Sequence, residues 1–161
     1  MIRSMCSTDA TRVMEIYSRA IEQGKAAFRR DCPTYQEWDT SYSQNGRFVY
    51  ETDGMVVGWI AVHPVSNSPW YEGVAEVSIY IDEAYRGCGI GTALLTKLCD
   101  ESESYGYWCL YASVFSENKA SIALHKKCGF REIGYREKLA KDRFGVWQDT
   151  TLLERRSQNI L

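Results

Sequence analysis

A glycine-rich hexad between two different hydrophobic patterns places the strongest constraint on this fold. Residues 86–91 read Arg-Gly-Cys-Gly-Ile-Gly. Before them apolar and polar residues alternate as in a strand, and after them apolar residues recur at helical spacing. Three glycines in five positions allow a tight turn and a close approach of backbone to a ligand. Free N–H groups at the start of the following helix favour an anion, and Arg86 adds a forked donor for phosphate oxygens. The hexad therefore predicts a strand–turn–helix unit that binds a pyrophosphate.

Two common phosphate-binding motifs do not fit the hexad. A Walker loop would continue with Gly-Lys-Ser/Thr, and the dinucleotide fingerprint would have a glycine where this chain has Thr92. A glycine-rich turn that binds nothing is the remaining alternative.

Hydrophobic periodicity predicts an α+β fold. Strands are expected over residues 2–3, 47–51, 55–62, 74–81, 109–114, 131–135 and 150–153, and helices over 9–21, from 34 onward, 90–102 and 119–128. Thr34 and Glu37 form a capping box at the start of the second helix, and Thr52-Asp53-Gly54 predicts a hairpin turn. The strand–helix–strand–helix order of the central part suits a parallel strand pair.

Composition limits the classes of protein and of partner. The 161 residues contain no repeat and no Pro/Gly/Ser linker, which favours a single domain over residues 1–161. A net charge of −2 gives no reason to expect nucleic acid, and no apolar run is long enough to span a membrane. Six cysteines without a Cys-x-x-Cys pair, with two histidines, predict no metal site and reduced thiols in the cytoplasm.

The Arg-x-x-Gly-x-Gly pattern resembles the acetyl-coenzyme A loop of the GCN5-related N-acetyltransferase (GNAT) superfamily. Four further segments resemble its phosphinothricin N-acetyltransferase branch, at residues 71–80, 118–121, 124–130 and 145–149. The resemblance implies a central, mostly antiparallel sheet with a splayed parallel strand pair, flanked by helices. It also implies an acetyltransferase that uses acetyl-coenzyme A and forms a homodimer.

The same resemblance assigns residues to the cofactor. It implies that the backbone of residues 79–81 pairs with the pantetheine arm, that the hexad holds the pyrophosphate, that Asn118 bonds the pantetheine, and that Lys127 reaches a phosphate. The full set is Ile79, Tyr80, Ile81, Arg86, Gly87, Cys88, Gly89, Ile90, Gly91, Asn118 and Lys127. Asn118 is also a favourable cap for the helix that follows, and the two roles can coexist.

Acetyl transfer needs a neutral amine, which costs about 4.6 kcal/mol to form from a lysine-like amine at pH 7 and about 1.4 kcal/mol from an α-amino group. The sequence therefore favours a small amino-acid-like acceptor. Glu76 is the candidate general base because a carboxylate within an apolar strand should have a raised pKa. The family implies the same role, and a glutamate facing solvent is the alternative.

His125 and Tyr80 are further catalytic candidates. His125 is predicted to act as an acid, a base or a substrate contact, and Tyr80 could protonate the leaving thiolate; packed core residues are the alternatives. Phe28, Tyr71, Glu76 and His125 are the expected substrate contacts. Trp147 and Asp149 are expected to shape the acceptor pocket or a dimer contact, although a core tryptophan explains Trp147 equally well.

The loop before Tyr71 departs from the branch. Ser66 and Ser68 stand where relatives commonly carry arginines that meet an acidic acceptor group, which should weaken such acceptors. Lys25 could supply the missing charge or could be a solvated surface residue. A peptide N-acetyltransferase and a non-catalytic coenzyme A sensor are the alternative functions.

Overall fold

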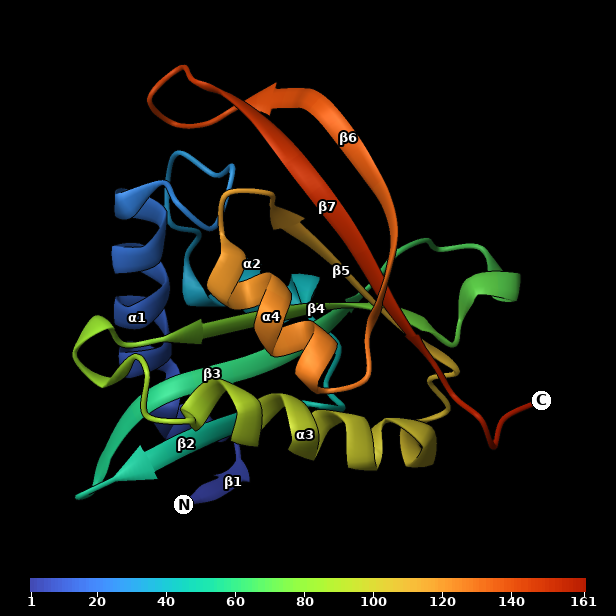
Figure 1. The fold of residues 1–161 in the computed structure, drawn as a ribbon. Coiled ribbons are helices and arrows are strands. Elements are labelled where there is room, and N and C mark those ends of the chain that lie inside the picture. Colours follow the sequence, from blue (N-terminus) through green and yellow to red (C-terminus); the bar gives the residue numbers. More distant parts are fainter.

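A seven-stranded sheet forms the centre of the computed structural model, which describes residues 1–161 (Figure 1). The spatial order of the strands is β1-β2-β3-β4-β5-β7-β6. Neighbours are antiparallel except for the central pair, β4 and β5, which is parallel. The bounds are β1 (Ile2–Ser4), β2 (Phe48–Thr52), β3 (Met55–Pro64), β4 (Val74–Ile81), β5 (Cys109–Phe115), β6 (Arg131–Lys141) and β7 (Trp147–Arg156).

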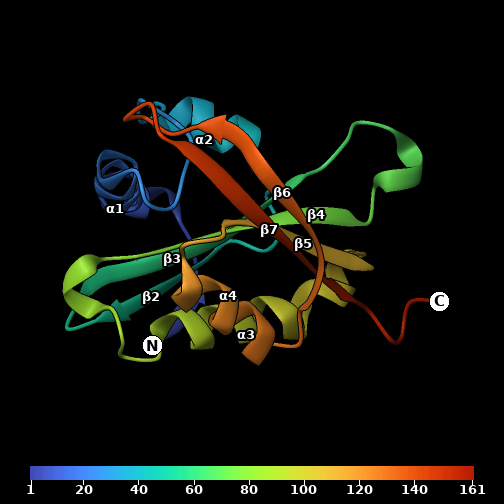
Figure 2. The same ribbon diagram turned by 45° about the horizontal axis from the view of Figure 1, so that its top comes forward.

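Four α-helices cover the two faces of the sheet (Figure 2). They are α1 (Ala10–Gln23), α2 (Tyr35–Ser41), α3 (Ile90–Ser102) and α4 (Lys119–Lys127). One core lies between the sheet and α1 and α2, with Trp38 and Trp59 as its largest side chains. A second core lies between the sheet and α3 and α4, with Leu94, Leu98 and Leu110 fully buried. None of the helices has the combination of length and apolarity that crossing a bilayer requires.

The predicted pattern matches most of these elements. The buried face of α1 consists of the five predicted residues, Val13, Ile16, Tyr17, Ala20 and Ile21. The capping box of Thr34 and Glu37 is formed, with the Glu37 amide donating to the Thr34 hydroxyl at 3.2 Å. β4 has the predicted bounds, and the parallel pairing of β4 with β5 is confirmed.

The last two strands are much longer than predicted. β6 and β7 form an antiparallel arm of 11 and 10 residues, where the sequence predicts only residues 131–135 and 150–153. In Figures 1 and 2 this arm rises away from α3 and α4, and its tip ends beside α1 and the loop that follows it, where Arg143 donates to the Ile21 carbonyl. Every residue of β6 except Ala140 is exposed, so its apolar pattern is weak and pairing with β7 defines the strand.

The parallel pair is joined over a short stretch only. Val74, Ala75 and Glu76 pair with Cys109, Leu110 and Tyr111, and beyond these residues β4 and β5 separate. β4 continues to pair with β3 as far as Ile81, while β5 continues along β7 as far as Phe115. One edge of each central strand is therefore left without a strand partner where the two diverge.

Candidate active site

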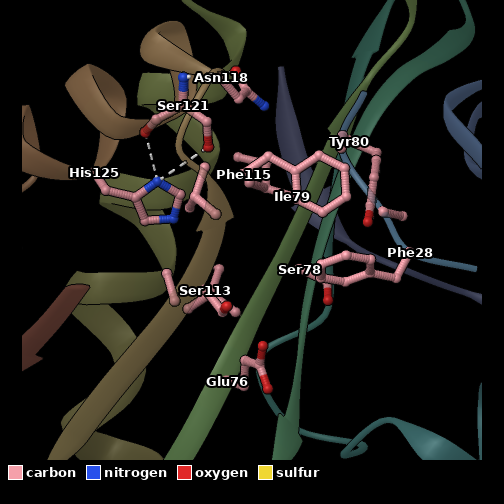
Figure 3. A pocket seen from close by; sticks show the side chains of 15 residues that line it. Phe28, Glu76, Ser78, Ile79, Tyr80, Ser113, Phe115, Asn118, Ser121 and His125 are labelled. Carbon is pink, nitrogen blue, oxygen red and sulfur yellow. Dashed lines mark hydrogen bonds between the residues drawn. The ribbon is translucent and has the colours of Figure 1, made fainter. Parts of the chain in front are cut away.

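A cavity of about 220 Å³ lies where β4 and β5 separate (Figure 3). Side chains from β4, β5, α4 and the loop after α1 line it. In Figure 3, Ser121 and His125 lie on one side, while Phe28, Ser78 and Tyr80 lie on the other. The full lining is Ala26, Ala27, Phe28, Glu76, Val77, Ser78, Ile79, Tyr80, Ala112, Ser113, Val114, Phe115, Asn118, Ser121 and His125.

The unpaired edge of β4 presents backbone groups to this gap. The amide of Asp82 donates to the Val57 carbonyl, and the amide of Val65 donates to the Val74 carbonyl. These two bonds show which residues in the antiparallel ladder with β3 form hydrogen-bonded pairs. Even-numbered residues of β4 therefore exchange hydrogen bonds with β3. The C=O group of Val77 and the N–H and C=O groups of Ile79 and Ile81 point the other way, into the gap beyond the last rung with β5. A ligand with an amide-bearing chain could add to this edge as a strand does.

The glycine-rich hexad forms the predicted turn before α3. Gly87 and Gly89 adopt left-handed conformations with φ of 75° and 78°, which a β-carbon would strain. The amides of Gly87, Cys88 and Gly89 donate to no backbone carbonyl, and an added β-carbon at Gly87 or Gly89 would meet no atom within 4 Å. The turn thus offers free donors and open space at a helix N-terminus, which fits a diphosphate.

Arg86 is exposed at the start of the turn. One guanidinium nitrogen donates to the side-chain oxygen of Gln23 in α1 at 3.1 Å, and no carboxylate pairs with it. Its charge is therefore available to an anion at the turn. Cys88, within the turn, is also exposed.

Glu76 projects from the face of β4 that carries Ser78 and Tyr80. Its side chain is 28% exposed, and burial raises its pKa while the charge of His63 opposes the rise. His63 on β3 is its direct cross-strand partner, with Nε2 3.6 Å from a carboxylate oxygen. The predicted raised pKa is confirmed, and a fully solvated glutamate is excluded.

His125 is 2% exposed on the inner side of α4, and its ring packs edge-on against Phe130. Burial lowers its pKa, so the ring is neutral at pH 7. Its Nδ1 lies 2.7 Å from the carbonyl oxygen of Ser121, and its Nε2 is buried without a hydrogen-bond partner. The residue is thus both a core histidine and a wall of the cavity.

Two aromatic candidates also line the cavity. Tyr80 packs against Tyr17 and Trp59, with ring centroids 4.9 and 5.1 Å away, and burial raises its pKa well above 10. Phe28 packs edge-on against Phe115 at 4.6 Å, so the loop after α1 contacts the end of β5. Tyr80 therefore keeps its proton, and Phe28 closes one side of the cavity.

Asn118 lines the cavity and caps α4, because its side-chain oxygen accepts from the Ser121 amide at 3.2 Å. Lys127 is the exposed last residue of α4 and makes no ion pair. Ile79 lines the cavity, whereas Ile81 and Ile90 pack in or against the core beneath α3.

Three residues that were expected to contact the acceptor or to shape its pocket lie outside the cavity. Tyr71 is 46% exposed in the loop before β4 and lines no part of it. Trp147 is 54% exposed beneath the ammonium group of Lys141, so its interpretation as a core residue is wrong. Asp149 accepts hydrogen bonds from the Tyr135 hydroxyl and the Lys138 amide within the β6–β7 arm.

The structure adds residues that sequence reasoning missed. Ser78, Ser113, Phe115 and Ser121 line the cavity, and His63 contacts Glu76 from β3. His63 could have been found only from the register between β3 and β4, which places it opposite Glu76. A predicted strand that ends at residue 62 stops one position before the partner of Glu76.

Comparisons with known proteins agree with this geometry. The model of the acetyltransferase (GNAT) family matches residues 11–130. An L-methionine sulfoximine/L-methionine sulfone acetyltransferase from Pseudomonas aeruginosa is 28% identical over 159 residues, covering 95% of this chain and 92% of that protein.

Two solved structures are similar over nearly the whole chain. One is a ribosomal-protein-alanine N-acetyltransferase from Brucella melitensis, with a TM-score of 0.90, 28% identity and coverage of 98% of this chain and 99% of that one. The other is a GNAT superfamily phosphinothricin acetyltransferase from Sinorhizobium meliloti in complex with acetyl-coenzyme A, with a TM-score of 0.89, 28% identity and coverage of 97% and 87%.

These matches confirm the resemblance noted in the sequence, together with its fold, its cofactor and its class of enzyme. The unpaired strand edge and the free amides of the turn fit that cofactor. The chain belongs to the GNAT family of acetyltransferases, which use acetyl-coenzyme A as the acetyl donor.

Proposed function

We propose that this chain, acting as a single domain, acetylates the primary amine of a small amino-acid-like molecule by direct attack in a ternary complex. The observation that carries the proposal is the cavity between β4 and β5, which has Glu76 on one side and a free strand edge along it. A volume of about 220 Å³ suits a thioester end and a small amine. The names of relatives that act on methionine sulfone and phosphinothricin support the acceptor class.

Residues of the turn and of β4 would hold the cofactor. The amides of residues 87–91 and the guanidinium of Arg86 would bind the diphosphate. The amides of Gly87, Cys88 and Gly89 donate to no backbone carbonyl, and the guanidinium has no carboxylate partner. The edge groups of Ile79 and Ile81 would pair with the pantetheine arm, and the amide nitrogen of Asn118 would donate to it. Lys127 would serve as an outer contact to a phosphate.

Glu76 would remove the proton from the attacking amine. Burial has already made its carboxylate more basic than a free glutamate, which suits a base at neutral pH. Acetyl-coenzyme A supplies a thioester carbonyl that is open to attack by a neutral amine. The inward N–H group of Ile79, which lies beyond the last rung between β4 and β5, would donate to the carbonyl oxygen as negative charge develops there.

Tyr80 would protonate the leaving thiolate. Its hydroxyl keeps a proton at neutral pH, whereas the Nε2 of His125 carries none when Nδ1 donates to Ser121. His125 would instead accept a hydrogen bond from a ligand in the cavity. Phe28 would contact the body of the acceptor.

The acidic group of an amino-acid acceptor needs a cation, and no Lys or Arg lines the cavity. Arg29, which follows Phe28, is exposed and has no carboxylate partner. Its charge lowers the pKa of Tyr42 and Tyr80, against the larger rise from burial, so it lies within electrostatic reach of the cavity. Arg29 would take the place of the arginines that Ser66 and Ser68 replace.

The β6–β7 arm would form the contact of a homodimer. β6 is an edge strand, and a set of large apolar side chains on and beside the arm is exposed: Ile133, Tyr135, Leu139, Phe144, Val146 and Trp147. Apolar side chains gathered on an edge strand favour pairing with a second copy.

The protein would act in the cytoplasm. All six cysteines are free thiols, the state that a reducing compartment maintains.

A screen of amines tests the acceptor class. Purified protein with acetyl-coenzyme A is offered single amino acids, their sulfone and phosphinate analogues, and peptides with free N-termini, and thiol release is followed. Turnover of amino acids is expected. Turnover of peptides alone would favour a protein N-acetyltransferase, the activity named for the Brucella melitensis structure, and tight cofactor binding without turnover would indicate a sensor.

A further inference from the structure

His63 and Glu76 form a pair that the sequence did not predict. They are directly opposite in the β3–β4 ladder and belong to a hydrogen-bonded pair, so their side chains share one face of the sheet. Nε2 of His63 lies 3.6 Å from Oε2 of Glu76, and the two side chains are 32% and 28% exposed. Glu76 lines the cavity whereas His63 does not. His63 therefore approaches the carboxylate from outside the cavity.

The imidazole of His63 is held in place by its neighbours. The ring of Tyr42 meets it edge-on, with centroids 5.3 Å apart and planes at 87°. The Tyr42 hydroxyl donates to Ser78 Oγ at 3.0 Å, and Ser78 is two residues from Glu76 on the same face of β4. Tyr42 thus packs on the histidine and bonds to the strand that carries the carboxylate, which keeps the imidazole beside Glu76.

We propose that His63 is a positioning residue for acetyl transfer, which orients the Glu76 carboxylate and receives from it the proton that the amine gives up. This inference rests on Glu76 acting as the base. The proton leaves the amine nitrogen for a Glu76 oxygen. It passes from Oε2 to Nε2 of His63 when their separation shortens to hydrogen-bond length, which restores the carboxylate and forms an imidazolium. The imidazolium then gives a proton to water.

The chemistry of the pair suits this sequence. Imidazole exchanges protons near neutral pH, and a third of this ring is open to solvent. Burial raises the pKa of Glu76, and the charge of His63 is the one that opposes it. The other titratable groups facing Glu76 are Tyr42, Tyr80, Tyr111 on β5 and, across the cavity, His125 on α4. The pKa values of Tyr42 and Tyr80 are raised, so these two phenols are neutral where a transferase works.

The pH profile of kcat/KM tests the inference. His63→Gln removes the imidazole, and His63→Phe keeps a ring against Tyr42 without a nitrogen to accept the proton. We expect the acid limb of both variants to move up by about half to one pH unit, which is a loss of about three- to tenfold below the limb. The KM for acetyl-coenzyme A should stay unchanged. The acceptor's own titration is common to all variants, so the difference between profiles belongs to the protein.

Further variants separate the possible outcomes. Glu72→Gln changes an exposed carboxylate outside the cavity and should leave the profile unchanged. In the Glu76→Gln background, His63→Gln should cause no further loss. An unmoved acid limb, or an equal loss at every pH, would overturn the role of His63 while Glu76 stands as the base. Full activity of Glu76→Gln alone would instead refute the base assignment itself.

Discussion

Nδ1 of His125 lies 2.7 Å from the carbonyl oxygen of Ser121, one turn earlier in α4 (Figure 3). A carbonyl can only accept, so Nδ1 carries the proton and Nε2 is left as an acceptor at the wall of the cavity. Burial of the ring disfavours a second proton. The hydrogen bond therefore assigns the Nδ1–H tautomer to His125, and the burial of this neutral ring makes the stability of the protein depend on pH.

The protein should lose stability as the pH falls below about 6.5, in part because of His125. Its pKa is lowered in the folded state, so the unfolded chain binds a proton at a higher pH than the native one. The contribution of the neutral ring is complete above the unfolded pKa and decreases as the pH falls toward the folded one. Thermal unfolding of wild type and His125→Gln between pH 5 and 8 checks this. The variant should lose less Tm between pH 7 and pH 5, and parallel curves would contradict the prediction.

Glu76→Gln should lower kcat by about 10²- to 10⁴-fold, the usual contribution of a general base. The amide keeps the size of the side chain and cannot accept the proton. Affinity for acetyl-coenzyme A, measured by calorimetry, should change little because the turn that binds the diphosphate is intact. Retained turnover across pH would show that water or another group takes the proton.

Arg86→Ala should weaken binding of acetyl-coenzyme A by about 10-fold or more, the loss of one charge-assisted hydrogen bond. Gly89→Val should weaken it as well, because a β-branched residue is strained at a φ of 78°. Arg30→Ala removes an exposed cation that is not part of the turn and serves as the control. Equal affinities of all three variants and wild type by calorimetry would rule out the assignment of the turn.

Arg29→Gln should raise the KM for an amino-acid acceptor by about 10-fold, since a charge-assisted contact to its carboxylate is lost. The KM for the matching amine without a carboxylate should stay the same. Arg30→Gln, which changes the neighbouring exposed cation of the same loop, is the matched control. Equal effects on both acceptors would show that Arg29 does not select for the acidic group.

Leu139→Asp should convert a dimer to a monomer without unfolding it. The side chain is 43% exposed on an edge strand, so a charge there costs little in one copy and much in an interface. Light scattering gives the mass, and circular dichroism checks the fold. A wild-type protein that is monomeric at high concentration would refute the dimer before the variant is made.

Much of the fold could be predicted because local patterns agreed with the tertiary structure. α1 and β4 carry strong 3.6- and 2-residue periodicities, and their buried residues follow them. β6 could not be predicted to its full length. Its sequence includes Glu137, Lys138 and Ala140, which rarely favour strands, and a register shift near Lys138 breaks the alternation.

The candidate site was predictable where chemistry marks single residues. Glu76, His125 and Asn118 stand out by type and position, and all three line the cavity. His63 was missed because its role depends on the register between two strands, and Tyr71 was included although its loop turns away from the cavity. Neither the register between the two strands nor the direction of the loop can be predicted from single residues.

A crystal structure with acetyl-coenzyme A tests the central claim most directly. The claim predicts a diphosphate on the amides of residues 87–91, a pantetheine arm paired with the edge groups of Ile79 and Ile81, and the thioester in the cavity beside Glu76. A cofactor bound elsewhere, with the turn and the strand edge free, would contradict it.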